Sequence, residues 1–208
     1  MVAYAFMMAG VSVMVLIAGI IGSELAPARE LATLPIALSV IGVASATLPT
    51  GRLLQKFGRR PVFLAYGAIA IGSAITASAS LYRDSFSGLC LAAFLMGWAG
   101  AAGHQYRFAA LEQVPAELAP KATSALLLGG ILSAFIGPEL AVRGRTLLEV
   151  DYAGSFLLLI VSYAAGMLVI SFYREADVPQ HERVTGGRPL LEIMRTPIVV
   201  LAVAAAGL

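Results

Sequence analysis

Polar residues that could do chemistry gather at one end of an apolar segment, where the chain reads His104-Gln105-Tyr106-Arg107. On a helix, His104 and Arg107 would share one face, because residues three apart are surface neighbours. An imidazole, an amide and a guanidinium could together bind a polar or anionic small molecule in a central cavity. The position of Arg107 instead favours an interfacial cation that reaches toward lipid headgroups. His104 and Gln105 lie deeper and favour the cavity or hydrogen bonds between helices.

A second set of charges lies beyond the end of this segment. Glu112 would face the same layer as Arg59, Arg60 and Lys121. One hypothesis is an ion-pair cluster that closes one side of the protein in one conformational state. The alternative is a set of solvated charges, which would contribute little to stability.

The sequence contains no arrangement of residues that is typical of an enzyme. It has no phosphate-binding Walker loop, and its serines are scattered through apolar segments without a nearby base. The single cysteine, Cys90, and the two histidines have no spacing that would hold a metal ion. No soluble basic domain is present to bind nucleic acid. We therefore expect no catalytic residues, no cofactor, no metal and no nucleic-acid partner.

The composition indicates a membrane protein. Of 208 residues, 59% are hydrophobic and only 12% are charged, whereas soluble domains carry roughly 25% charged residues. The charges separate apolar runs of about the 20 residues that a membrane helix needs. We expect six complete spans, with Pro49 and Pro138 at the ends of the second and fifth, over residues 2–22, 32–50, 61–82, 85–106, 122–138 and 152–173.

A seventh apolar run starts near Thr196 and stops at Leu208. Its thirteen residues would rise about 20 Å, against a hydrocarbon core of about 30 Å. We therefore expect a chain that is truncated within a seventh span.

The distribution of basic residues orients these spans. The turn at 51–60 holds four of the fourteen Lys and Arg residues, and the segments 107–121 and 174–195, on the same side, hold two and four more. The opposite side holds the remaining four. Since Lys and Arg accumulate in cytoplasmic loops, the expected location is the inner membrane, with the N-terminus in the cytoplasm and the lipid bilayer as a partner.

The basic turn resembles the loop between spans 2 and 3 of the major facilitator superfamily, whose usual pattern is G-x-x-x-D-[RK]-x-G-[RK]-[RK]. The spacing, the glycines and the cations match, while Gln55 replaces the acidic residue and brings no charge. The matching positions are Gly51, Gln55, Lys56, Gly58, Arg59 and Arg60.

The resemblance implies an all-α fold, namely the six-helix N-terminal bundle of a twelve-span transporter, built from two inverted three-helix repeats. Residues 1–173 would form the bundle. Residues 174–195 would form the central cytoplasmic loop with a short interfacial helix, and 196–208 the start of span 7. The C-terminal six-helix half would be a partner that this sequence does not contain.

A further resemblance lies in span 5, where Gly130 and Gly137-Pro138 are similar to the Gly-Pro motif of proton-coupled antiporters in the same superfamily. Such a pair loosens a helix, because proline removes one backbone hydrogen bond. The alternative is an ordinary proline near the end of a helix.

These features predict a secondary transporter that moves a small-molecule substrate by alternating access. The Gly-Pro motif favours efflux by antiport. An uptake permease for a metabolite or vitamin is the alternative, favoured by Gln55 and by the lack of an acidic residue near the middle of any span. A non-transporting fragment that needs a second bundle is the alternative from another class.

The orientation can be tested by labelling cysteines from outside the cell. In a chain whose Cys90 is replaced by alanine, we expect Gln55→Cys to resist a membrane-impermeant thiol reagent, because the basic turn would face the cytoplasm. Asp84→Cys, in the short turn on the opposite side, is the control and should react. Labelling of Gln55→Cys in intact cells would contradict this orientation.

Overall fold

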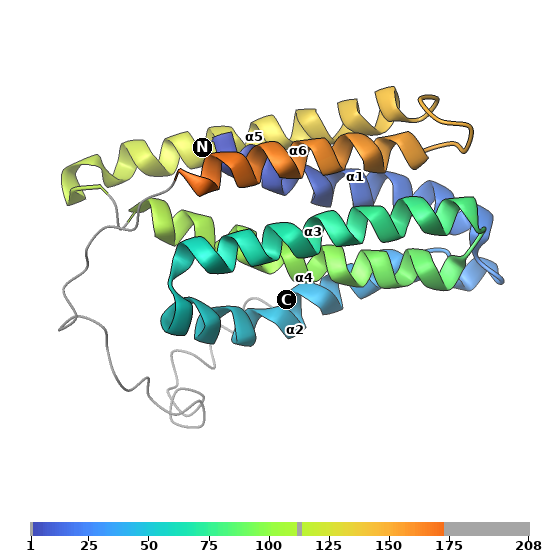
Figure 1. Cartoon of the computed structure of the whole chain (residues 1–208), viewed down its shortest axis with the longest axis horizontal. Coiled ribbons are helices and arrows are strands. Elements are labelled where there is room, and N and C mark those ends of the chain that lie inside the picture. The colour runs from blue at the N-terminus through green and yellow to red at the C-terminus, as the bar shows by residue number, and fades with distance from the viewer. Residues whose placement is uncertain (1, 112–113, 173–208) are drawn as a thin grey trace. The chain divides into compact units, whose positions relative to one another are not determined.

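The computed structural model describes residues 2–111 and 114–172, and this part of the chain forms six long helices (Figure 1). Each is long and apolar enough to cross a membrane, so the expected all-α fold with six spans is confirmed. Short 3₁₀ turns, η1 (Arg29–Leu31) and η2 (Ala116–Leu118), precede α2 and α5. The helices are α1 (Val2–Leu25), α2 (Leu34–Phe57), α3 (Arg59–Tyr82), α4 (Phe86–Leu111), α5 (Ala119–Gly144) and α6 (Ala153–Ser171).

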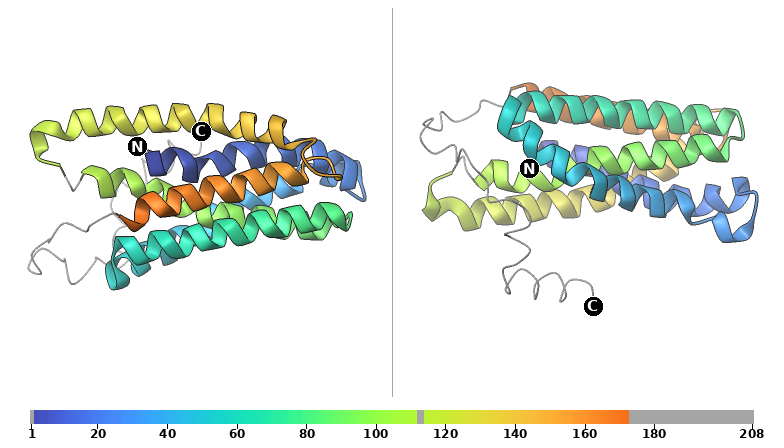
Figure 2. Two further views of the ribbon diagram at one scale, coloured as in Figure 1. Left: turned by 45° about the horizontal axis from the view of Figure 1, so that its top comes forward. Right: turned by 90° about the horizontal axis from the view of Figure 1, so that it is seen from below.

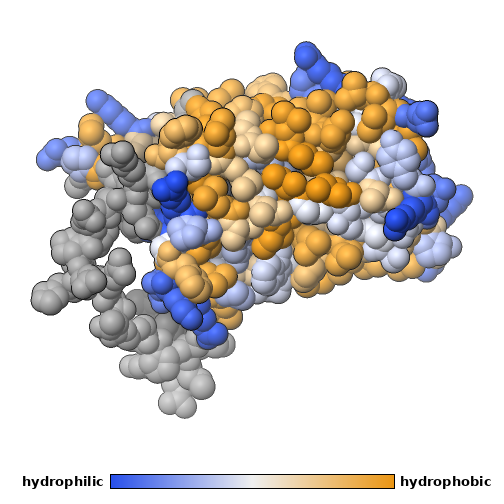
Figure 3. Space-filling model, viewed as in Figure 1, coloured by the Kyte–Doolittle hydropathy of each residue, from blue (hydrophilic) through white to orange (hydrophobic). Residues whose placement is uncertain are grey.

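The surface of the bundle is apolar along the middle of the helices. In Figure 3, hydrophobic residues form a broad band, and hydrophilic residues gather toward the two ends. Large apolar side chains of the helices are exposed, and Phe135 in α5 is 73% exposed. A water-soluble protein rarely leaves an apolar patch of this extent uncovered, and the hydrocarbon core of a bilayer is the environment that suits it.

The helices pack as two interlocked triplets. The second helix of each triplet packs mainly on the first helix of the other: α2 lies against α4, and α5 lies against α1. The two first helices, α1 and α4, contact each other, and so do the two third helices, α3 and α6 (Figures 1 and 2). Exchanging α1–α3 with α4–α6 leaves this pattern unchanged, as inverted three-helix repeats require.

The sequence carries a local trace of this repeat. The link before α2 reads PARELA over residues 27–32, and the link before α5 reads PAELA over residues 115–119. Each link forms a 3₁₀ turn, and each is followed by a helix with proline in its first turn, Pro35 in α2 and Pro120 in α5. The two links therefore start equivalent helices in the two triplets.

The expected ends of spans 2 and 5 were wrong. α2 continues past Pro49 to Phe57, and α5 continues past Pro138 to Gly144. A proline removes only one bond from the helix. Within a membrane no water competes for the remaining backbone groups, so a helix tolerates the loss. The other described spans lie within a few residues of their expected bounds.

The expected loop 174–195 and seventh span 196–208 lie outside the described residues. By backbone contacts the chain divides into two units, Met1–Glu175 and Ala176–Leu208. The first contains the bundle described above.

A buried polar contact joins α2 to α3. The Thr50 and Tyr66 side chains are both almost completely buried, and their oxygens lie 2.6 Å apart. The Thr50 hydroxyl also donates to the Ala46 carbonyl at 2.6 Å. Since Thr50 has a single hydroxyl proton, the Tyr66 hydroxyl donates to Thr50.

The direction of the hydrogen bond from Tyr66 to Thr50 predicts that two substitutions will lower the free energy of unfolding by different amounts. Tyr66→Phe leaves Thr50 bonded to Ala46, so it should cost about 1 kcal/mol of unfolding free energy. Thr50→Val strands the buried Tyr66 hydroxyl and should cost up to about 3 kcal/mol. The two thermal unfolding temperatures in detergent would order the variants. A larger loss for Tyr66→Phe would contradict the assigned donor.

Candidate functional site

Helices α2 and α4 touch through their backbones. A side chain at Gly97 of α4 would overlap the Ser39 carbonyl of α2, and one at Gly42 of α2 would overlap the Phe94 carbonyl of α4. One turn further along α4, Gly100 lies between the side chains of two helices rather than against backbone. The absence of side chains at Gly97 and Gly42 thus allows α4 to pack directly against α2 at this crossing.

The crossing of α1 and α5 uses the Gly-Pro motif in the same way. A side chain at Gly137 would overlap the Ser12 side chain and lie 3.0 Å from the Ala9 carbonyl oxygen, both in α1. Gly130 is different, because a side chain there would meet only the Tyr4 ring, at an ordinary 3.7 Å. Pro138 lies inside the continuous helix. The structure therefore gives Gly137 a packing role, and a coupling role of the motif stays a prediction.

One surface of α4 faces α1 and α2 around Gly100, which is itself buried, and we call it the central face. A side chain at Gly100 would touch Val11 of α1 and Val43 of α2, each at 3.8 Å. His104 follows Gly100 by about one helical turn and is exposed. Gly100, Val11, Val43 and His104 define the central face, which is mostly apolar and carries one imidazole.

The structure separates His104 from Gln105. Gln105 lies about 100° further round the helix, is half-buried, and shares its side of α4 with Trp98, two turns earlier. For Arg107 only the helical backbone is described, and Glu112 lies outside the described residues. The proposed contact of Glu112 with Arg59 and Arg60 therefore stays a prediction. Of the predicted cavity residues, His104 alone has a described side chain on the central face.

Trp98 packs between α2 and α3, away from the central face. Its ring is parallel to that of Tyr66, with centroids 6.1 Å apart. Its indole N–H donates to the Ser45 hydroxyl at 3.0 Å. These contacts explain the tryptophan as a packing residue.

The basic turn is shorter than expected, since residues 51–57 are the last turns of α2 and α3 begins at Arg59. Only Gly58 breaks the helices, at φ 81° and ψ 174°, and a positive φ of this kind favours glycine. Gln55, Lys56 and Arg60 are exposed. The Lys56 ammonium lies 5.2 Å from the Phe57 ring. The signature is thus a one-residue joint between two helices with cations around it.

Charged contacts occur at the other end of the bundle, in the α5–α6 hairpin. Arg145 donates to Asp151 at 3.2 Å and stacks over the Tyr152 ring. The hydrogen bond to Asp151 is the main cause of a raised pKa of the Arg145 guanidinium. Glu139 and Arg143 pair along the end of α5. Among the residues that the structure describes, no group of three His, Cys, Asp or Glu residues could hold a metal ion.

Six membrane-length helices in interlocked triplets define a polytopic membrane protein. The sequence matches the family model of the Major Facilitator Superfamily over residues 1–208, and the chain belongs to this family. It is a transporter-family protein and not an enzyme. No solved structure matches the chain.

Among curated proteins, the chain is 31% identical over 196 residues to a riboflavin transporter, RfnT, of Brucella anthropi. The aligned region covers 93% of this chain and 49% of that relative. The chain thus spans about half the length of the curated relative that it matches.

The two glycines of the Gly-Pro motif should respond differently to a methyl group. Gly137→Ala should lower the unfolding free energy by about 1–3 kcal/mol, because the new methyl collides with α1. Gly130→Ala is the matched control in the same helix and should be neutral or slightly stabilising. Thermal unfolding of the two variants in detergent measures both effects. Equal stability would contradict the packing role of Gly137.

Proposed function

We propose that this chain is the N-terminal bundle of a secondary transporter that moves a flat, neutral heteroaromatic metabolite of the flavin type by alternating access. The observation that carries the proposal is the relationship to a riboflavin transporter over 93% of the chain. Family membership supports the transport mechanism. The lack of any enzyme-like arrangement in the sequence is consistent with it.

The central face suits such a substrate. The exposed Val11 and the half-buried Val43 flank the buried Gly100, and they offer an apolar surface against which a flat ring system can lie. The exposed His104 adds a group that both donates and accepts hydrogen bonds. Ligand sites combine a mostly apolar lining with a few such polar groups.

A second bundle would complete the site. The helices α2 and α5 are less enclosed than the other spans, and they flank α1 and α4 on either side. A C-terminal six-helix bundle against this side would place the substrate between two bundles near the bilayer midplane. The backbone contacts at Gly97 and Gly137 would let α1–α6 rock as one rigid unit.

The proposed setting is the inner membrane, with the N-terminus in the cytoplasm. The exposed cations around Gly58 support this orientation, because they would lie in the cytoplasmic headgroup layer. The joint at Gly58 connects α2 to α3, and both extend to the same end of the bundle. Movement of α2 would therefore reach this joint directly.

For the direction of transport we favour uptake, the alternative from the sequence. Packing against α1 accounts for Gly137 without a role in coupling. The acidic residues of the described helices, Glu24 and Glu139, lie toward helix ends rather than midway along a span, so this half supplies no acidic proton carrier there. Efflux by antiport is the second candidate, and the Gly-Pro sequence itself favours it.

Transport of labelled riboflavin by cells that express the full-length protein tests both the substrate class and the direction of transport. We expect accumulation above an empty-vector control, reduced about fivefold by His104→Ala, the size of one lost hydrogen bond. Gln105→Ala, on another side of α4, is the matched control and should retain most of the activity.

Depletion of label in place of accumulation would overturn uptake in favour of efflux. Collapse of the signal by a protonophore would show proton coupling. Cells that neither accumulate nor lose the label relative to the empty vector would contradict the proposed substrate class.

A further inference from the structure

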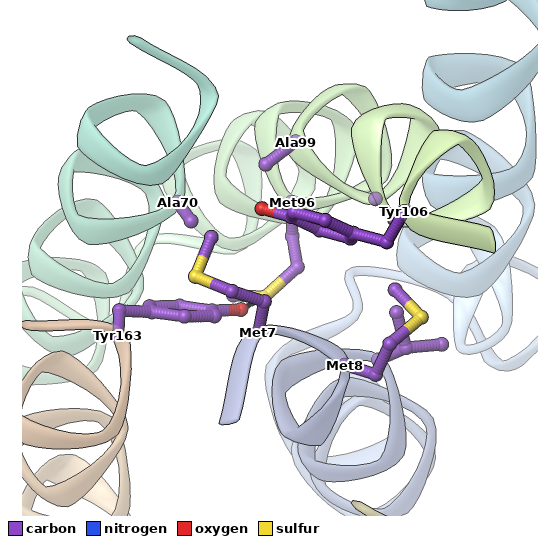
Figure 4. Close-up of a pocket in the computed structure, with 10 residues that line it drawn as sticks. Met7, Met8, Ala70, Met96, Ala99, Tyr106 and Tyr163 are labelled. Carbon is purple, nitrogen blue, oxygen red and sulfur yellow. Dashed lines mark hydrogen bonds between the residues drawn. The ribbon is translucent and has the colours of Figure 1, made fainter. Parts of the chain in front are cut away.

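A small cavity lies inside the described bundle, among α1, α3, α4 and α6 (Figure 4). It has room for about one water-sized group. One end of the cavity reaches Val11 and Gly100 of the central face. Its walls are thioethers, small residues and two tyrosine rings, including Met7, Met8, Met96, Gly103, Tyr106 and Tyr163.

The Tyr106 hydroxyl is buried without a partner. Tyr106 is only 8% exposed, and its hydroxyl is the buried side-chain polar atom that has no hydrogen-bond partner among the described residues. The ring is held by Phe63, with centroids 4.4 Å apart, and by an edge contact with Tyr4 at 6.2 Å. Because both rings restrict Tyr106, its hydroxyl cannot easily turn to water. A buried polar group in this condition calls for an explanation.

A second hydroxyl enters the same cavity from α6. Tyr163 is 2% exposed, and its hydroxyl donates to the Met96 sulfur at 3.0 Å. A thioether is a weak acceptor, and the lone pairs of the Tyr163 oxygen remain available. A side chain at Gly10 would overlap this hydroxyl, so the glycine in α1 makes room for it. Figure 4 shows both hydroxyl ends pointing into the space beside Met7 and Met96.

We propose that this cavity is a binding site for one neutral hydroxyl-type oxygen, held by the Tyr106 hydroxyl. The source is either a hydroxyl of the transported substrate, which would enter from the central face, or a resident water molecule. Only the first source rests on the proposed function. The two tyrosines together offer a donor and acceptors, which matches an O–H group. The remaining lining is apolar, so a charged group would be stranded there.

The site is tested in the full-length protein purified in detergent, with Tyr106→Phe as the variant. Tyr82→Phe, at the exposed end of α3, is the matched control. Two properties are measured for each: the unfolding temperature without ligand, and the affinities for riboflavin and for lumiflavin, from quenching of flavin fluorescence. Lumiflavin keeps the ring system but lacks the ribityl hydroxyls, so it separates ring binding from hydroxyl binding.

A substrate hydroxyl predicts that Tyr106→Phe weakens riboflavin binding about three- to tenfold, leaves lumiflavin binding unchanged and does not lower the unfolding temperature. A resident water predicts the reverse, namely a lower unfolding temperature and unchanged affinities. Ala70→Val, which fills the cavity while keeping both hydroxyls, should likewise weaken the binding of riboflavin but not of lumiflavin if the oxygen comes from the substrate. No change in either property relative to Tyr82→Phe would overturn the site.

Failure of the wild-type protein to bind riboflavin would contradict the proposed function and not, by itself, the cavity. In that case the unfolding temperatures alone test whether the cavity holds a water molecule. A decrease in Tyr106→Phe supports a resident water, and an unchanged or higher value overturns the site.

Discussion

The direct contact of helix backbones is the constraint on which this structure depends. Between helices in lipid there is little hydrophobic driving force, since the tails are as apolar as the side chains, and close packing has to replace it. Gly97 against Ser39 and Gly137 against Ser12 provide this packing at two crossings. These contacts set which helices adjoin and place α4 beside α1 and α2, where the central face lies.

The same apolar surroundings explain why polar side chains in the bundle are bonded so fully. Serines and threonines donate mostly to backbone carbonyls, either in their own helix or across a crossing, as Ser73 does to Ala92 and Ser155 to Ala141, each at 2.7 Å. An unpaired group has no water nearby to compensate for it. Against this background the unpartnered hydroxyl of Tyr106 stands apart, and it is the observation on which the proposed binding site rests.

Prediction from the sequence succeeded for features that depend on local composition, and it failed for features that depend on contacts between helices. Apolar length identified all six described spans, because a bilayer requires about 20 apolar residues whatever surrounds them. The predicted helix ends at Pro49 and Pro138 were wrong, because a membrane helix can continue through a proline that would end a helix in water. Gln105 and His104 are neighbours in the chain, yet a step of about 100° places them on different sides of α4. Tyr163 could not have been connected with Tyr106 from the sequence, because the two line one cavity only through the packing of α6 and α4 against α1.

The sequence by itself determined the six described spans, the membrane as solvent, the family and the presence of a cationic connection between the second and third spans, because hydropathy, charge and short spacing are local properties. Only the tertiary structure decided which faces of the helices are open, that Gly137 packs while Gly130 does not, and that a cavity joins Tyr106 to the central face. The physical reason is that these features depend on backbones far apart in the chain coming within van der Waals contact, and hydropathy contains no information on which apolar surfaces will meet.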